Sequence, residues 1–324
     1  MSADRRVLVT GGAGFIGSHV CERLIASGWK VRCMDDLTTG HRSNIQALEG
    51  GHFSFVEADI RDASALRAAL EGIDRVVHLA ALGSVPRSIA DPLASESVNL
   101  TGTLQLFTEA RAAGVERVVY ASSSSVYGDS ASLPKREGEE GRPLSPYAVT
   151  KAMNEAYALL HHRLFDLRTI GLRFFNVFGE RQDPAGPYAA AIPRFVEALF
   201  AHRPPKVHGD GAQTRDFTYV KNAAQAVERA LTTDDDRAFG SVFNIAYGER
   251  TDLLQLIALI RELAAQLDPA IATIGVEHGP PRSGDVQDSL ADITRAREVL
   301  GFDPDHDLRQ GLERALQWYR LLQA

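Results

Sequence analysis

Short apolar runs alternate along this chain with longer segments whose apolar residues recur at helical spacing. The first run, Arg6 to Thr10, is rich in β-branched residues and leads to a helical segment that ends near Ser27. Strands that alternate with helices are typical of a parallel sheet with helices on both faces. The pattern therefore predicts an α/β fold built on a doubly wound parallel sheet. The predicted strands span residues 6–10, 30–34, 53–56, 75–79, 115–121, 169–175 and 242–245.

A glycine-rich segment joins the first predicted strand to the first helix. Residues 11–17, Gly-Gly-Ala-Gly-Phe-Ile-Gly, follow the pattern G-x-x-G-x-x-G, and the next strand ends on Asp35 and Asp36. Glycines allow a tight turn and a close approach of the backbone to a pyrophosphate at the helix N-terminus. An acid roughly 20 residues later is placed to bind a ribose diol. This order of strand, loop, helix, strand and acid predicts a dinucleotide-binding (Rossmann) domain.

The candidate chemistry lies between Ala121 and Lys151. Four serines, residues 122–125, follow a predicted buried strand, and Ser145-Pro146 opens a helix that places Tyr147 and Lys151 on one face. A phenol with a pKa of about 10 is a poor base at neutral pH, and a neighbouring ammonium favours its phenolate. Tyr-x-x-x-Lys alone is common on solvated helix faces. Together with the serines and the nucleotide loop, it predicts a catalytic pair.

A long helix is predicted for residues 91–113, with Asn99 near its middle. An exposed polar side chain and a functional one fit this position equally well on sequence alone. The segment before this helix, residues 80–84, is rich in small residues that would let the backbone approach a flat cofactor.

The second half of the chain is less regular and contains loops rich in proline and glycine. Residues 206–208 and 214–219 are predicted as short strands around the turn Gly209-Asp210-Gly211. We expect a dinucleotide-binding domain at 1–175, to which part of 215–245 returns, and a smaller α/β substrate-binding lobe at 176–324. Doubly wound folds bind ligands at the carboxyl ends of their strands. The helices predicted here span residues 189–201, 221–231, 252–267, 293–300 and 308–322.

Composition narrows the function classes. A formal net charge of −7 and a pI near 5.8 argue against a general nucleic-acid binder. Cys21 and Cys33 are too few for a disulfide framework and lack the spacing of metal ligands, so we expect a reducing cytoplasm and no metal site. No apolar run approaches the roughly 20 residues of a membrane span, and the start of the chain leaves no room for a signal peptide.

Taken together, these motifs resemble the extended short-chain dehydrogenase/reductases over essentially the whole chain. The resemblance is greatest to the UDP-galactose 4-epimerase family, and within it to bacterial UDP-N-acetylglucosamine 4-epimerases of O-antigen polysaccharide synthesis. It implies NAD as cofactor, a UDP-sugar substrate and a homodimer in which the helices at about 91–113 and 147–165 pair. The segments that carry it are GSVPRSI at 83–89, SPYAVTK at 145–151, GLRFFNVFG at 171–179, RQDP at 181–184, RDF at 215–217 and SLAD at 289–292.

The resemblance also assigns roles to residues. Tyr147 would be the base, Lys151 its electrostatic partner and a ligand of the nicotinamide ribose, and Ser123 the hydroxyl that bridges Tyr147 to the sugar O4. Asp35 would bind the adenosine ribose and repel a 2′-phosphate, which favours NAD over NADP. The further cofactor contacts implied are Gly11, Gly14, Phe15, Ile16, Gly17, Asp59, Ile60, Ala80 and Phe174. The further substrate contacts implied are Ser84, Ser124, Asn176, Gln182, Ala190, Ala191, Val207, Arg215, Arg282, Asp285 and Ser289.

The implied reaction is 4-epimerisation of a UDP-hexose through a transient 4-keto sugar. In the family, Ser289 falls where a bulky side chain excludes the 2-N-acetyl group in strict UDP-glucose/galactose enzymes. We therefore expect UDP-GlcNAc and UDP-GalNAc as substrates, with UDP-Glc and UDP-Gal weaker. The alternative is a UDP-N-acetylhexosaminuronic acid or UDP-glucuronic acid 4-epimerase, in which Arg87 or Arg181 meets the sugar carboxylate.

Two other activities fit the motifs less well. Nucleotide-sugar 4,6-dehydratases carry Thr-Asp-Glu where this chain has Ser123-Ser124-Ser125, so the acid that expels the 6-hydroxyl as water is missing. A non-catalytic NAD-binding regulator commonly loses the tyrosine or the lysine, and this chain retains both.

Overall fold

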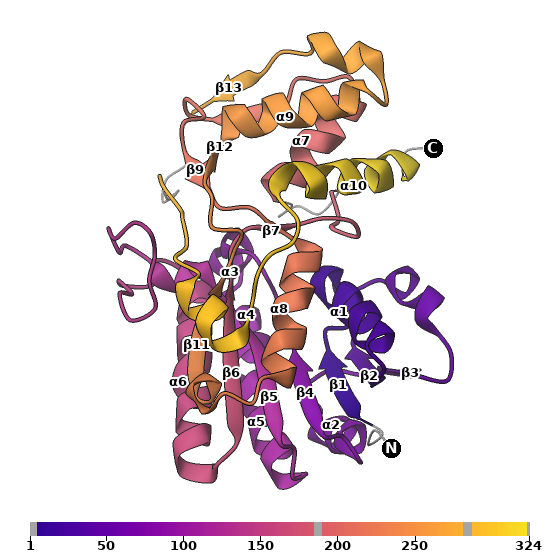
Figure 1. The fold of residues 1–324 in the computed structure, drawn as a ribbon, viewed down its shortest axis with the longest axis vertical. Coiled ribbons are helices and arrows are strands. Elements are labelled where there is room, and N and C mark those ends of the chain that lie inside the picture. Colours follow the sequence, from indigo (N-terminus) through magenta and orange to yellow (C-terminus); the bar gives the residue numbers. More distant parts are fainter. Residues whose placement is uncertain (1–4, 185–189, 281–286, 323–324) are drawn as a thin grey trace.

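The computed structural model describes residues 5–184, 190–280 and 287–322. Seven parallel strands form its main sheet, in the order β11-β6-β5-β4-β1-β2-β3, so the winding reverses between β1 and β4 (Figure 1). Both faces are covered, and this is why the strands read as almost continuous apolar runs in the sequence. The predicted doubly wound α/β fold is confirmed. The strands are β1 (Arg6–Thr10), β2 (Lys30–Asp35), β3 (Phe53–Glu57), β4 (Arg75–His78), β5 (Arg117–Ser123), β6 (Arg168–Phe174) and β11 (Ser241–Ile245).

Helices cover the two faces of this sheet. On one face α1 and α8 pack together over a core that includes Val9 and Phe243, and on the other α2, α5 and α6 enclose Leu8 and Phe107. The helices of this part are α1 (Phe15–Ala26), α2 (Ala63–Leu70), α3 (Val85–Ala90), α4 (Pro92–Glu96), α5 (Gly102–Ala112), α6 (Pro146–Phe165) and α8 (Val220–Thr232).

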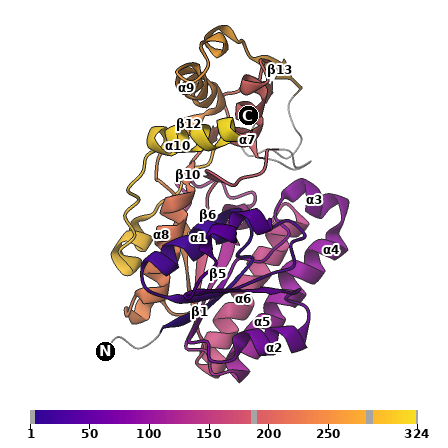
Figure 2. The same cartoon turned by 90° about the vertical axis from the view of Figure 1, so that its right-hand side faces the viewer.

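A smaller lobe lies beyond the carboxyl ends of the strands (Figures 1 and 2). Its core packs α7, α9 and α10 around residues such as Phe195, Leu256 and Leu316. Among the residues described, no helix combines the length and apolar character needed to cross a bilayer. The elements of this lobe are β7 (Val177–Phe178), α7 (Ala191–Phe200), β8 (Lys206–His208), β9 (Thr214–Arg215), β10 (Thr218–Tyr219), β12 (Thr251–Asp252), α9 (Leu253–Ala265), β13 (Glu277–Gly279) and α10 (Leu308–Leu321).

The hairpin expected around Gly209-Asp210-Gly211 is not formed, and that prediction is wrong. β8 pairs in parallel with β13, which lies about 70 residues further along the chain. The segment predicted as one strand at 214–219 divides into β9, which pairs with β12, and β10, which pairs with β7. Pairing between strands so distant in sequence leaves no local pattern in the sequence. A glycine-containing turn between two short apolar runs, in contrast, has the local pattern of a hairpin even where no hairpin forms.

A π-helical turn, Ser97–Thr101, joins α4 to α5 within the helix predicted at 91–113. Asn99 lies in this turn, and its side chain is fully buried. Its Oδ1 accepts the N–H of Leu82 at 2.7 Å, and its Nδ2 donates to the carbonyl of Leu82 at 3.0 Å. The exposed interpretation of Asn99 is therefore wrong, because this amide holds the loop that follows β4. π-turns of this kind are frequent at functional sites.

Replacement of Asn99 by Ala would leave the N–H and carbonyl of Leu82 without partners. We expect Asn99→Ala to lower the free energy of unfolding by about 2 kcal/mol, as measured by urea denaturation. Thr108→Ala on the exposed side of α5 is the control and should change it by less than about 0.5 kcal/mol. Equal losses in the two variants would contradict this account of Asn99.

Candidate active site

The glycine-rich segment that joins β1 to α1 leaves no space for a side chain at Gly11 or Gly17. Gly11 has φ +70°, and a Cβ there would lie 2.5 Å from the backbone nitrogen of Ala80. A Cβ on Gly17 would overlap the carbonyl oxygen of Gly11. Gly14 is the N-cap of α1, so the first backbone N–H groups of this helix, from Phe15 onwards, have no partner within it. The loop therefore forms a cradle for an anion such as a pyrophosphate.

Asp35 closes this cradle at the end of β2. Its Oδ2 accepts the N–H of Ala13 at 3.0 Å, and its Oδ1 accepts the N–H of Leu37 at 2.9 Å. The side chain is buried, and burial raises the pKa of its carboxyl. A carboxylate beside a glycine loop at the end of the second strand suits the diol of an adenosine ribose.

The other expected cofactor contacts differ in their surroundings. Asp59 accepts hydrogen bonds from the guanidinium of Arg61, with Nε at 3.0 Å, and this contact lowers the pKa of Asp59. Ile60 is buried, and Gly102 of α5 lies so close to it that a Cβ there would meet its side chain at 2.8 Å. Phe174 is buried at the end of β6. Their roles as cofactor contacts remain predictions.

Ser123, Tyr147 and Lys151 converge where β5 meets the start of α6. The hydroxyl of Ser123 lies close enough to the phenol of Tyr147 to favour loss of the phenol proton. The ammonium of Lys151 lies 5.8 Å from the centroid of the Tyr147 ring and donates to the carbonyl of Ala121 at 2.9 Å. Ser145 caps this helix by accepting the N–H of Ala148, with Pro146 in the first turn, as the sequence indicated. The structure therefore brings the three expected catalytic side chains together.

Burial shifts the pKa values of both Tyr147 and Lys151. It raises the pKa of Tyr147, and the nearby hydroxyl of Ser123 opposes that change. Burial also lowers the pKa of Lys151 to about 8. The sequence predicted a lowered phenol pKa, and the direction is the reverse because desolvation penalises both the phenolate and the ammonium. Additional positive charge is needed before the phenol becomes a strong base.

The hydroxyl of Ser123 is oriented by its neighbour Ser125. Its oxygen accepts the N–H of Ser125 at 3.2 Å and the hydroxyl of Ser125 at 2.9 Å. With both acceptor positions occupied, the hydrogen of Ser123 is free to point at the oxygen of Tyr147 or of a ligand. Ser124 lies half-buried in the 3₁₀ turn Ser124–Tyr127 that follows.

A cavity of about 940 Å³ lies where the smaller lobe faces the sheet. Two of its lining residues, Ser84 and Asn176, have positive φ angles of 103° and 35°. Such backbone strain in non-glycine residues is concentrated at functional sites. Asn176 is held by a hydrogen bond from its Nδ2 to the carbonyl of Asp216 at 3.0 Å. The lining includes seven expected substrate contacts: Ser84, Asn176, Gln182, Ala190, Ala191, Val207 and Arg215.

Four other expected contacts, all described, are not part of this lining: Ser123, Ser124, Tyr147 and Ser289. Tyr147 is nevertheless tied to the cavity wall, because its backbone N–H donates to the hydroxyl of Ser88 at 3.0 Å, one turn along α3 from Ser84. Ser289 follows Asp288, whose carboxylate accepts the hydroxyl of Thr214 at 2.7 Å. Arg282 and Asp285 lie outside the described residues.

Sequence reasoning missed several polar groups around this site. Ser125 and Asn99 were not assigned, and neither was Glu155, which lies four residues beyond Lys151 on the same helical face. That spacing was visible in the sequence, as was the charged Arg173 inside an apolar strand. Within the described ranges, no group of three or more His, Cys, Asp or Glu side chains could hold a metal ion.

Comparison with known proteins agrees with this geometry. The family model described as "NAD dependent epimerase/dehydratase family" matches residues 7–246. The chain is 40% identical to a UDP-glucose 4-epimerase from Mycolicibacterium smegmatis, over 97% of this chain and 98% of the relative. It also resembles the solved UDP-N-acetylglucosamine 4-epimerase from Methanobrevibacter ruminantium M1 in complex with UDP-N-acetylmuramic acid, with 37% identity, a TM-score of 0.92 and coverage of 98% and 99% of the two chains.

A second solved structure is informative about the cofactor. The UDP-glucuronic acid 4-epimerase from Bacillus cereus, in complex with UDP-glucuronic acid and NAD, is 32% identical with a TM-score of 0.89, and the match covers 98% of this chain and 99% of that one. The family match, the near-complete coverage and the glycine cradle lead to the same conclusion: this chain belongs to the NAD-dependent epimerase/dehydratase family, with NAD as its cofactor.

Proposed function

We propose that this protein is a UDP-sugar 4-epimerase that interconverts UDP-GlcNAc and UDP-GalNAc, with UDP-Glc and UDP-Gal as weaker substrates. The observation that carries the proposal is the convergence of Ser123, Tyr147 and Lys151 at the carboxyl end of β5, two strands from β1 and the glycine-rich loop that follows it. Side chains that can remove a proton from a sugar hydroxyl lie next to a site for a hydride acceptor, as oxidation of an alcohol requires.

In the proposed mechanism, Tyr147 accepts the proton of the sugar 4-hydroxyl, and Ser123 orients both oxygens. The ammonium of Lys151 stabilises the phenolate that acts as the base. When bound, NAD supplies the positive ring charge that further favours the phenolate and the acceptor that takes the C4 hydride and returns it. The 4-keto sugar turns about its phosphate linkage between these steps, and Tyr147 returns the proton to O4. There is no net oxidation.

The residues of the cradle suit NAD. The N–H groups at the start of α1 would hold the pyrophosphate together with Gly11 and Gly14, and Asp35 would accept the ribose hydroxyls. A carboxylate at this position repels a 2′-phosphate, which supports NAD over NADP.

The size and lining of the cavity support an N-acetylated substrate. A volume of about 940 Å³ is at the upper end of the range for small-molecule sites and suits a nucleotide sugar. The small side chains of Ala190 and Ala191 line it. The similarity to a UDP-N-acetylglucosamine 4-epimerase points the same way.

A uronic-acid substrate is the second candidate, favoured by Arg87 and by the similarity to UDP-glucuronic acid epimerases. Arg87 follows Val85 and Pro86, which line the cavity. Arg181, the other arginine expected at the carboxylate, pairs through its guanidinium with Glu22 of α1 at 3.0 Å.

The purified protein, with no NAD added, should convert UDP-GlcNAc to its 4-epimer faster than it converts UDP-Glc. Proton NMR of parallel incubations with UDP-GlcNAc, UDP-Glc and the 6-carboxylated UDP-GlcNAc measures this directly. Tyr147→Phe is the control and should lose at least about a hundredfold in turnover, because the base is removed. Conversion of only the carboxylated sugar would indicate a uronic-acid 4-epimerase instead. Conversion of none of the three sugars would favour a non-catalytic NAD-binding regulator.

Enlarging residue 289 should alter the choice of sugar. We expect Ser289→Tyr to reduce kcat/KM for UDP-GlcNAc at least about tenfold, while kcat/KM for UDP-Glc changes by less than about threefold, since only the acetylated sugar needs the space. Steady-state assays with both sugars test this. The idea of Ser289 as the selector fails if both substrates are affected equally.

We also propose a homodimer formed through α3, α4 and α6. Exposed apolar residues lie at positions 149, 153, 160 and 164 of α6, a spacing that places them along one face. Leu93 of α4, which packs on α6, is 80% exposed, and Ile89 of α3 is 62% exposed. An apolar surface of this extent is typical of a protein interface, and a second copy of the chain would bury it.

Charges placed on this face should separate the dimer. We expect the double variant Leu160→Glu with Leu164→Glu to have the mass of one 35.2 kDa chain by light scattering, whereas the unmodified protein has about twice that mass. Leu321→Glu with Leu322→Glu, two exposed leucines at the end of α10, is the matched control and should remain dimeric. A dimer that survives the first pair of substitutions contradicts this interface.

A further inference from the structure

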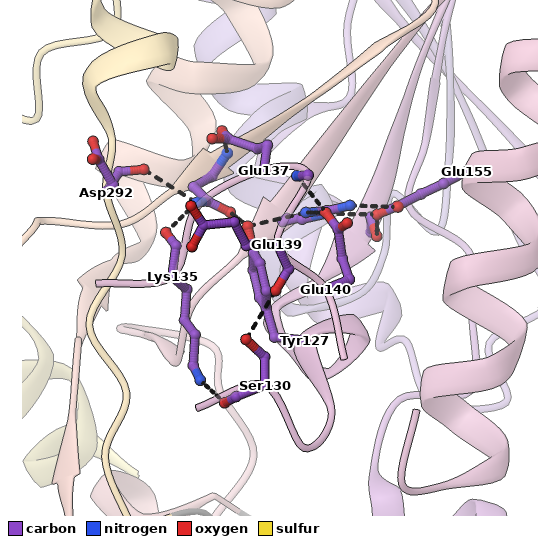
Figure 3. A network of polar contacts seen from close by, with 12 residues as sticks. Tyr127, Ser130, Lys135, Glu137, Glu139, Glu140, Glu155 and Asp292 are labelled. Atoms are coloured by element: carbon purple, nitrogen blue, oxygen red, sulfur yellow. Dashed lines mark hydrogen bonds and ion pairs between the residues drawn. The ribbon is translucent and has the colours of Figure 1, made fainter. Parts of the chain in front are cut away.

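A buried ionic network connects β6, the helix α6 and the 3₁₀ turn that follows β5 (Figure 3). At its centre is Arg173 of β6, whose side chain is only 3% exposed. The guanidinium binds Glu155 of α6 in two places, with Nε to Oε1 at 2.8 Å and Nη2 to Oε2 at 2.7 Å. It also pairs with Glu140 and donates to the hydroxyl of Tyr127 at 2.9 Å. Two carboxylates thus share one cation.

Glu155 belongs both to this network and to the catalytic helix. It lies one helical turn beyond Lys151, so the two side chains share a face of α6. Its Oε1 also accepts the hydroxyl of Ser122 at 2.5 Å, and Ser122 directly precedes Ser123 on β5. Contacts with both β5 and β6 therefore fix the carboxylate of Glu155 at the strand ends that carry the active site.

Other charged and titratable groups lie around Lys151. Tyr147 is on the same helix, His78 of β4 is close enough for the charge of Lys151 to act on it, and Arg173 on β6 binds Glu155. His78 is buried between the hydroxyls of Thr10 and Thr103, and burial lowers its pKa to about 3, so it is neutral at physiological pH. Among these groups Glu155 is the negative charge that acts on Lys151.

We propose that Glu155 is a positioning residue that keeps the side chain of Lys151 protonated, and that Arg173 and Ser122 hold Glu155 in place for this purpose. The inference rests on the roles proposed for Tyr147 and Lys151 in epimerisation.

The physical reason is the balance of two opposing effects on the ammonium. Burial lowers the pKa of Lys151 to about 8, and the charge of Glu155 opposes this change. The protonated form is complete below that pKa and is lost as the pH rises through it. Without the carboxylate, the same loss would occur at lower pH, and a neutral amine cannot stabilise the phenolate of Tyr147.

The structure offers a matched control for this idea. Glu140 also pairs with Arg173, but it does not contribute to the pKa shift of Lys151. Glu140→Gln disturbs the same arginine without removing the charge that acts on the lysine. Glu155→Gln removes that charge and retains an acceptor for Ser122.

The pH dependence of kcat separates the electrostatic role from a structural one. In Glu155→Gln we expect the decline of kcat at high pH to shift downward by about one unit, with at least about a tenfold loss at pH 8 and little change in KM. Glu140→Gln should retain the pH profile of the unmodified enzyme. Glu155→Asp keeps the negative charge and should therefore have a pH profile of kcat close to that of the unmodified enzyme. Thermal melting should verify that each variant is folded.

The charge of Lys151 can also be measured without turnover. The lysines of this chain are few, so NMR of ¹³C-lysine-labelled protein can follow each titration, with Lys151→Arg identifying the signal. We expect the Lys151 resonance to titrate about one pH unit lower in Glu155→Gln than in Glu140→Gln. Identical titrations and identical pH profiles in the two variants would overturn the inference.

Failure of the inference and failure of the proposed function give different results. If the unmodified protein epimerises no UDP-sugar, the function is wrong, and the lysine titration alone still tests Glu155. If it epimerises UDP-sugars and Glu155→Gln shows an unshifted profile, only the role of Glu155 is wrong. If Glu155→Gln does not fold, Glu155→Asp provides the test. A shifted pH profile of kcat in Glu155→Asp, which retains the negative charge, would overturn the inference.

Discussion

The burial of a positive charge is the constraint on which this active site depends. Lys151 is 4% exposed, and an ammonium withdrawn from water is unstable unless the protein supplies partners. Its contacts here are the carbonyl of Ala121 and the ring of Tyr147, and the carboxylate of Glu155 lies one turn further along the same face of α6. They come from the end of β5 and from one face of α6. The packing of α6 against the end of β5 must therefore be fixed for Lys151 to remain charged.

The surrounding loops are tied to the same elements by buried hydrogen bonds. Asn154 of α6 donates to the carbonyl of Asn99 at 2.9 Å, and Asn99 in turn holds Leu82 in the loop that follows β4. On the lobe side, the buried carboxylate of Asp216 accepts the N–H groups of Gly248 and Ala291, each at 3.2 Å. Buried and partly buried polar contacts thus tie the loop that follows β4 to the catalytic helix and join the segments around Asp216, Gly248 and Ala291.

Sequence alone could predict those features whose causes are local. The strands follow from apolar runs, the cradle from the glycine spacing, and the shared face of Tyr147 and Lys151 from their separation of four residues. The false hairpin near Gly209 and the buried position of Asn99 depend on partners far along the chain. The direction of the tyrosine pKa shift depends on burial, which no local pattern reveals. The identity of the catalytic side chains was therefore easier to predict than their electrostatic environment.

The central claim is reversible oxidation at C4 with Tyr147 as the base, and the most direct test follows the hydrogen on that carbon. UDP-GlcNAc carrying deuterium at C4 would be incubated with the enzyme in ordinary water, and the product analysed by NMR and mass spectrometry. The account predicts that the deuterium remains at C4 in the epimer, because the hydride is taken and returned within one bound complex. Loss of deuterium to solvent, or epimerisation with exchange at another carbon, would contradict it.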